Sequence, residues 1–118
     1  MDEVKAAEAI GEMVALSKKK YELLKGIHTL TIKQSGLIDE EHLEELNQLI
    51  DEKQVLIENI NEIDRRFEEK WDTLKNGLHA RDVREIKVEK GLEGILPLQE
   101  TITQILEITQ SIKKLEEE

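Results

Sequence analysis

The stretch NQLIDEKQVLIENINEIDRRF, residues 47–67, repeats leucine and isoleucine at intervals of three and four residues. This spacing places the apolar side chains on one side of an α-helix. At about 100 degrees per residue, they cover roughly 160 degrees of the helix circumference. The full set comprises Leu43, Leu46, Leu49, Ile50, Leu56, Ile57, Ile60, Ile63 and Phe67. The stretch therefore predicts a long amphipathic helix that packs against other helices.

Lys53 lies near the middle of this apolar arc, and no carboxylate on its own helix is spaced to pair with it. One interpretation is that its stem packs while the ammonium reaches water at an edge. The other is a polar layer against the preceding helix. In a hairpin that turns near residue 37, Lys53 lies opposite residue 21, where Tyr21 or Glu22 receives the ammonium. Such a layer costs stability but can determine register, and Asp64 is a second polar interruption of the arc.

Helix-forming residues dominate on both sides of the opening stretch, and we expect an all-α fold in a single domain. A first helix is predicted over residues 2–34, ending before Ser35 and Gly36, and a second over residues 40–76, with Asp39 as its N-cap. Together they form a long antiparallel hairpin. Residues 79–94 are expected to be a linker or a short helix. A C-terminal helix follows over residues 97–116, with Pro97 in its first turn, and completes a bundle or coiled-coil-like arrangement.

Composition limits the function. The 118 residues include 17 lysines and arginines against 27 aspartates and glutamates, a net charge of -10. Phosphates repel such a chain, so nucleic acid and anionic membranes are not expected as partners, whereas a basic or amphipathic protein segment is. The acidic start lacks the basic region of a secretory signal, and no apolar run reaches the ~20 residues needed to span a bilayer. We therefore expect a cytoplasmic protein without membrane insertion.

Residues suited to catalysis or metal binding are scattered. His28, His42 and His79 have no spacing that would gather ligands on one helix face. The segment INEIDRRF, residues 60–67, resembles a helix of the all-helical chorismate mutases, but Arg65 and Arg66 are adjacent and diverge by about 100 degrees on a helix. The converging cations which that chemistry needs are missing. We predict no catalytic, cofactor or metal site and no enzyme activity.

The predicted C-terminal helix has an apolar face that covers about half its circumference, wider than the ~100 degree stripe that docking on one surface requires. Its members are Leu98, Ile102, Ile105, Leu106, Ile108, Ile112 and Leu115. Either the helix packs into the groove of the hairpin and its excess width contacts both other helices, or part of the face stays available for a partner helix. We treat these seven residues as candidate partner-binding residues.

The run LTIKQSGLIDEEHLEELNQLIDEKQVLIENINEID, residues 30–64, resembles the central part of the FlgN and FliT type flagellar export chaperones, FlgN more closely. The shared pattern, L-x-x-L-I-x-x-K-x-x-L-I-x-x-I, is matched by Leu46, Leu49, Ile50, Lys53, Leu56, Ile57 and Ile60. The resemblance implies a small cytoplasmic chaperone without ATPase activity. It implies binding of the C-terminal helical segment of an unassembled hook-associated or filament-cap subunit, which is then passed to the type III export machinery.

In this family cargo recognition falls largely on the C-terminal portion, which corresponds here to residues 98–115. No residue-level motif carries across to that portion, so the seven candidate residues rest on amphipathicity alone. The alternative from a different class is a structural helical-bundle protein that forms a homodimer without cargo.

Overall fold

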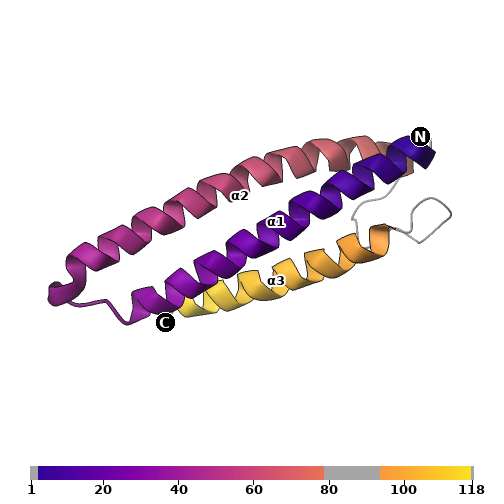
Figure 1. Ribbon diagram of the computed structural model, residues 1–118. Helices are drawn as coiled ribbons and strands as arrows, with labels where there is room; N and C mark the ends of the chain where they lie inside the picture. The colour runs from indigo at the N-terminus through magenta and orange to yellow at the C-terminus, as the bar shows by residue number, and fades with distance from the viewer. Residues whose placement is uncertain (1–2, 79–93, 118) are drawn as a thin grey trace.

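The computed structural model describes residues 3–78 and 94–117, and every regular element in these ranges is helical. The order is α1 (Glu3–Ser35), the short 3-10 helix η1 (Glu40–His42), α2 (Leu43–Leu78) and α3 (Ile95–Glu117). α1 packs along both α2 and α3, which have few close backbone contacts with each other (Figure 1). The all-α fold, with a helical hairpin and a third helix, is confirmed.

The helix ends lie close to those predicted. α1 differs by one residue at each end. α2 continues two residues beyond the expected end, so Gly77 lies inside its last turn and does not terminate it. α3 begins two residues early, which places Pro97 in the first turn, where its missing N–H has no helical partner to lose. The linker or short helix expected over residues 79–94 lies, apart from Gly94, outside the described residues.

The connection between α1 and α2 is organised by Asp39, as predicted. Its backbone is extended, with φ -156° and ψ 168°, and its carboxylate accepts a hydrogen bond of 2.9 Å from the backbone N–H of His42. The Nδ1 atom of His42 lies 2.7 Å from the same oxygen. This capping lowers the pKa of Asp39, mainly through the hydrogen bond with the imidazole. Asp39 thus satisfies a free N–H at the start of η1, which leads directly into α2.

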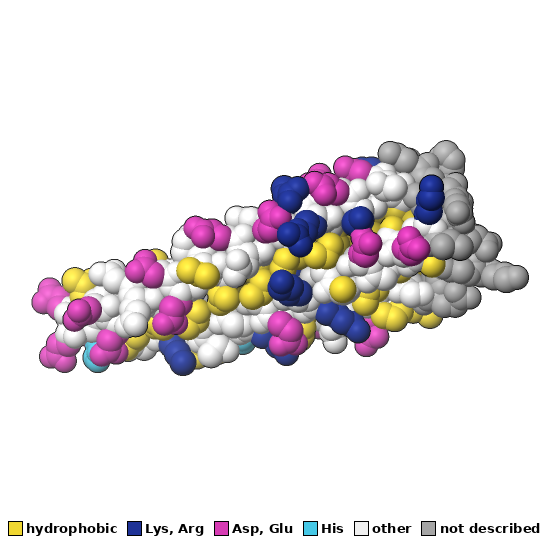
Figure 2. All heavy atoms as spheres, turned by 45° about the horizontal axis from the view of Figure 1, so that its top comes forward, with side chains coloured by type: hydrophobic (Ala, Val, Ile, Leu, Met, Phe, Trp, Pro, Cys, Tyr) yellow, Lys and Arg dark blue, Asp and Glu magenta, His cyan; other side chains and the backbone are white. Residues whose placement is uncertain are grey.

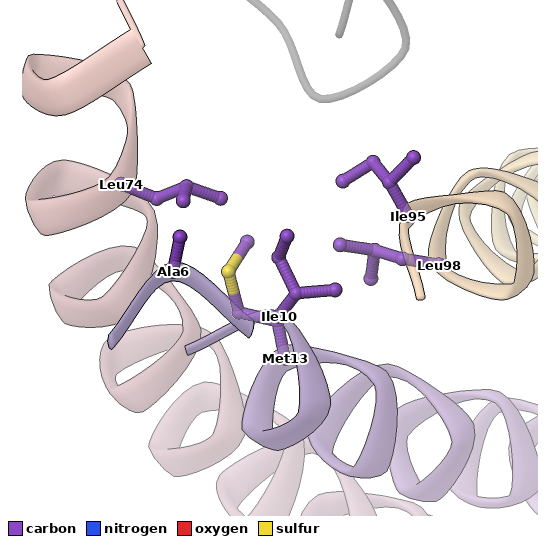
Figure 3. Close-up of a cluster of buried hydrophobic side chains, with 6 residues drawn as sticks. All are labelled: Ala6, Ile10, Met13, Leu74, Ile95 and Leu98. Carbon is purple, nitrogen blue, oxygen red and sulfur yellow. The ribbon is translucent and has the colours of Figure 1, made fainter. Parts of the chain in front are cut away.

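The core consists of two clusters that each draw side chains from all three helices. Near the N-terminal end of α1, the first contains Ala6, Ile10, Met13, Leu74, Ile95 and Leu98, which point toward one another (Figure 3). The second, toward the other end, contains Leu24, Ile27, Ile60, Ile105 and Ile112. Full burial of a leucine or isoleucine contributes roughly 1.5–3 kcal/mol. Docking of α3 therefore stabilises the hairpin at both ends.

The register of the hairpin differs from the prediction. Gln34 of α1 bonds to Lys53 of α2, and Lys20 of α1 bonds to Asp64 of α2. The halfway points of the two pairs fall between residues 42 and 44, whereas the prediction assumed a turn near residue 37. The reason is the connection over residues 36–42, because it lets the first turns of α2 extend past the end of α1 before the chains run side by side (Figure 1).

Hydroxyl groups within the core bond to their own helices. Ser17 Oγ donates to the carbonyl of Val14 at 3.1 Å, and Thr31 Oγ1 donates to that of Ile27 at 2.7 Å. Among the residues that the structure describes, no buried side-chain nitrogen or oxygen lacks a partner. Because their hydroxyl groups are hydrogen-bonded, these small polar residues can be buried in the bundle without an uncompensated desolvation penalty.

Candidate partner-binding surface

The seven candidate residues of α3 divide into three groups. Leu98, Ile105 and Ile112 are buried in the core clusters. Ile102, Ile108 and Leu115 are half-buried. Leu106 is 45% exposed. Most of the apolar face thus packs against the hairpin. The part that remains at the surface is mainly Leu106.

A row of exposed apolar residues on α2 was not among the candidates. Leu43 is 58% exposed, Ile50 is 45% exposed and Ile57 is 37% exposed. They recur every seven residues, so they form a line along one flank of the helix. We call them the α2 row. The prediction assigned all three to the buried arc. Their seven-residue spacing, however, places them along one edge of that arc, whereas Lys53 and Ile60 lie at its centre.

Between the two core clusters lies a hollow of about 220 Å³ formed by all three helices. We call it the Ser17 pocket. Most of its lining is apolar side chains of α2 and α3, and its polar groups come from the Lys20–Asp64 pair and from Ser17. The lining residues are Ser17 and Lys20 of α1, Ile63, Asp64 and Phe67 of α2, and Ile102, Ile105 and Leu106 of α3. Since Asp64 and Leu106 are exposed, the pocket opens to solvent between α2 and α3.

Of the two interpretations of Lys53, the contacts agree with the polar layer, but its partners are not the expected ones. Lys53 is only 9% exposed, and its Nζ donates to Gln34 Oε1 at 3.0 Å and lies 3.3 Å from Glu116 Oε1. The layer therefore joins all three helices. Tyr21 and Glu22, the predicted acceptors, lie elsewhere. Tyr21 packs against the second core cluster, and Glu22 forms an ion pair with Lys25. The error follows from the register, since the level of Tyr21 is that of Asp64.

Charged side chains lie on the outer surface, and several of those on α2 form ion pairs within the helix. Arg65 and Arg66 both bond to Glu62, at 2.7 and 3.1 Å, and Arg65 also bonds to Glu69. These hydrogen bonds lower the pKa of Glu62 to about 2. Hydrophobic side chains form a band along the molecule, with acidic and basic groups on both sides of it (Figure 2). The two arginines are on the surface with carboxylate partners, unlike a pocket that binds a dicarboxylate.

The two histidines within the described residues do not form a common site. His42 contacts Asp39, His28 is half-buried on α1, and His79 lies outside the described residues. Within residues 3–78 and 94–117, no group of three histidine, cysteine, aspartate or glutamate side chains is arranged to hold a metal ion. No helix in the same ranges combines the length and hydrophobicity needed to cross a membrane.

Comparison with known families identifies the chain. A family model described as FlgN protein matches residues 1–118. This chain belongs to the FlgN family. The family implies a flagellar export chaperone and binding of flagellar proteins, and it is a chaperone family rather than an enzyme family. No curated protein and no solved structure matches the chain. The resemblance to FlgN that residues 30–64 indicated is thereby confirmed.

Proposed function

We propose that this FlgN family member is a cytoplasmic chaperone for hook-associated subunits of the flagellum. It binds the C-terminal helical segment of such a subunit and prevents premature assembly before type III export. The observation that carries the proposal is the match of the FlgN family model over residues 1–118. Hook-filament junction subunits are the cargo that we favour, and the filament-cap subunit is the alternative.

The physical mechanism is reversible burial of apolar surface. An exported subunit whose terminal helix is amphipathic will associate with other copies unless that helix is covered. The chaperone has exposed apolar side chains on two neighbouring helices, at the α2 row and at Leu106. Its net charge of -10 favours a helix with a neutral or basic polar face. No bond is made or broken, and so neither a cofactor nor nucleotide hydrolysis is needed.

The test is a titration of the purified protein with a fluorescent peptide that spans the C-terminal helix of a hook-filament junction subunit. We expect saturable binding with one peptide per chaperone chain. A peptide of the same composition in scrambled order is the matched control, since it retains charge but not amphipathicity. Equal binding of both peptides, or of neither, contradicts the proposal.

The competing function is a structural bundle protein that uses its exposed apolar side chains to form a homodimer. Leu43 and Ile38, which is 71% exposed at the connection between α1 and α2, are the observation that favours it. Sedimentation velocity distinguishes the two functions. A structural protein is expected to form a stable dimer that the cargo peptide does not alter, whereas a chaperone forms a complex with the peptide.

A further inference from the structure

The core of the bundle is interrupted halfway along α1. Met13 is fully buried in the first cluster and Leu24 is buried in the second. Between them, the inward positions of α1 are held by Ser17, which is 2% exposed, and by Lys20, which is directed to Asp64. Neither supplies apolar bulk at this level. The Ser17 pocket is the space that a larger residue at position 17 would occupy.

The lining and size of the pocket suit the binding of a single large side chain. Ile63 and Phe67 approach from α2, and Ile102 and Ile105 from α3, so its inner surface is mostly apolar. Its volume of about 220 Å³ is smaller than the ~300–1,000 Å³ typical of sites for small molecules and cofactors. Pockets of this kind hold one large apolar or aromatic residue from a protein partner, and such residues dominate binding energy at interfaces.

The surface beside the pocket indicates a helical occupant. Leu106 is exposed at its edge on α3. On α2, the exposed apolar residues Ile50 and Ile57 precede Asp64 at intervals of seven residues, and Asp64 lines the pocket. One flank of α2 thus leads along the helix into the pocket. A partner helix lying on this flank would keep its own apolar residues in register with the seven-residue spacing.

Charge decides between a second copy of this chain and a different protein. Two copies, each with a net charge of -10, repel one another, whereas a helix with basic residues on its polar face is attracted. The Lys20–Asp64 pair at the pocket is partly exposed, 27% and 47% at the two side chains, so a partner can approach it without stranding a buried charge.

We propose that the Ser17 pocket receives one large apolar side chain from an amphipathic partner helix with a neutral or basic polar face. The helix lies between α2 and α3 and adds to the bundle, with α3 remaining docked. The identity of the partner as flagellar cargo rests on the proposed function, but the pocket and the chemistry of its occupant do not. In this arrangement Ile105 forms part of the pocket wall, and the buried residues Leu98 and Ile112 stay in the two core clusters and do not leave them to bind cargo.

The principal experiment fills the pocket from within, using Ser17→Leu. The leucine side chain replaces the anchor of the partner and adds apolar burial, so we expect the Tm to rise by about 3–6 °C. Binding of the partner helix should weaken by at least about tenfold. Ser111→Leu is the matched control, because Ser111 is exposed on α3 away from the pocket and its replacement should leave binding unchanged. A second variant, Leu106→Lys, changes an exposed rim residue and should weaken binding without affecting folding.

Two probes separate this inference from the proposed function. The first is the C-terminal helix peptide of a hook-filament junction subunit, and the second is a designed amphipathic helix of leucine and lysine. Methyl NMR signals of Ile102 and Ile105 should shift when either probe binds. If only the designed helix binds and Ser17→Leu abolishes its binding, the inference stands and the cargo assignment fails.

Several outcomes overturn the inference itself. Unchanged binding to a folded Ser17→Leu protein, together with unchanged binding to Leu106→Lys, excludes the pocket while leaving the chaperone function intact. If neither probe binds the wild-type protein, the inference and the proposed function both fail. A dimer of the wild-type protein that Ser17→Leu dissociates would assign the pocket to a second copy and would overturn the choice of occupant.

Discussion

Replacing Lys53 with methionine tests the polar layer that joins the three helices. The variant Lys53→Met keeps most of the buried stem but removes the ammonium and its bond to Gln34 Oε1. Loss of a hydrogen bond from a charged donor costs about 1.5–3 kcal/mol. The contact with Glu116, whose side chain is 54% exposed, contributes at most about 1 kcal/mol because solvent screens it.

The gain from the substitution is larger than this loss. Taking an ammonium out of water carries a penalty of several kcal/mol, and this penalty disappears in the variant. The two acceptors are not stranded, since Gln34 and Glu116 both retain access to water. We therefore expect Lys53→Met to stabilise the fold by about 1–2 kcal/mol, in the range measured when buried ion pairs are replaced by apolar residues. For a domain of this size the Tm should rise by about 3–8 °C.

The same variant should loosen the end of α3. Glu116 lies near the end of that helix, and its contact with Lys53 is a polar link from there to α2. We expect faster amide hydrogen exchange over residues 112–117 despite the higher Tm, because the remaining contact there is apolar and less directional. Lys70→Met is the matched control, since Lys70 forms a more exposed pair with Glu12 and its removal should alter neither quantity appreciably. A lower Tm for Lys53→Met, or unaltered exchange at the end of α3, would refute the reasoning.

Two further predictions concern glycine and acid stability. An alanine at Gly11 meets no neighbour within 4 Å, so Gly11→Ala should stabilise α1 by about 1 kcal/mol in thermal unfolding. At Gly26 the added Cβ would lie 3.2 Å from Leu56 Cδ1, so Gly26→Ala should gain less, and equal gains at both sites would contradict the observed packing. Since the pKa of Glu62 is lowered from 4.5 to about 2, its pairing stabilises the fold above that range and is lost as pH falls. Glu62→Gln should therefore lower the Tm at neutral pH, and the difference should close between pH 4.5 and about 2; a constant difference would show that the carboxylate is not responsible.

Local chemistry explains why so much of the fold could be predicted. The positions of α1, α2 and α3 follow from helical periodicity and from end signals within a few residues, such as the N-cap at Asp39 and the proline in the first turn of α3. The interruption at Lys53 was also visible, because it depends only on the neighbours of that residue along one helix. Each of these features is decided within one or two helical turns.

Long-range geometry accounts for what could not be predicted. The acceptors of Lys53 depend on how far α2 extends past the end of α1, and on where the end of α3 docks. The same holds for α3, whose seven apolar residues look alike in periodicity but differ in burial once α1 lies against them. Periodicity could not separate Leu106, at the rim, from Ile105, in the core.

By itself, the sequence determined an acidic three-helix protein with a polar residue in the middle of an apolar arc, because charge and helical period are properties of the chain alone. The tertiary structure decided that Lys53 joins Gln34 to Glu116, that α1 packs along both other helices, and that Ser17 leaves a pocket between two core clusters. A serine on a helix predicts only a small side chain. A pocket forms beside that serine only because the two other helices bring isoleucine and phenylalanine to the same level and no side chain of α1 fills the space.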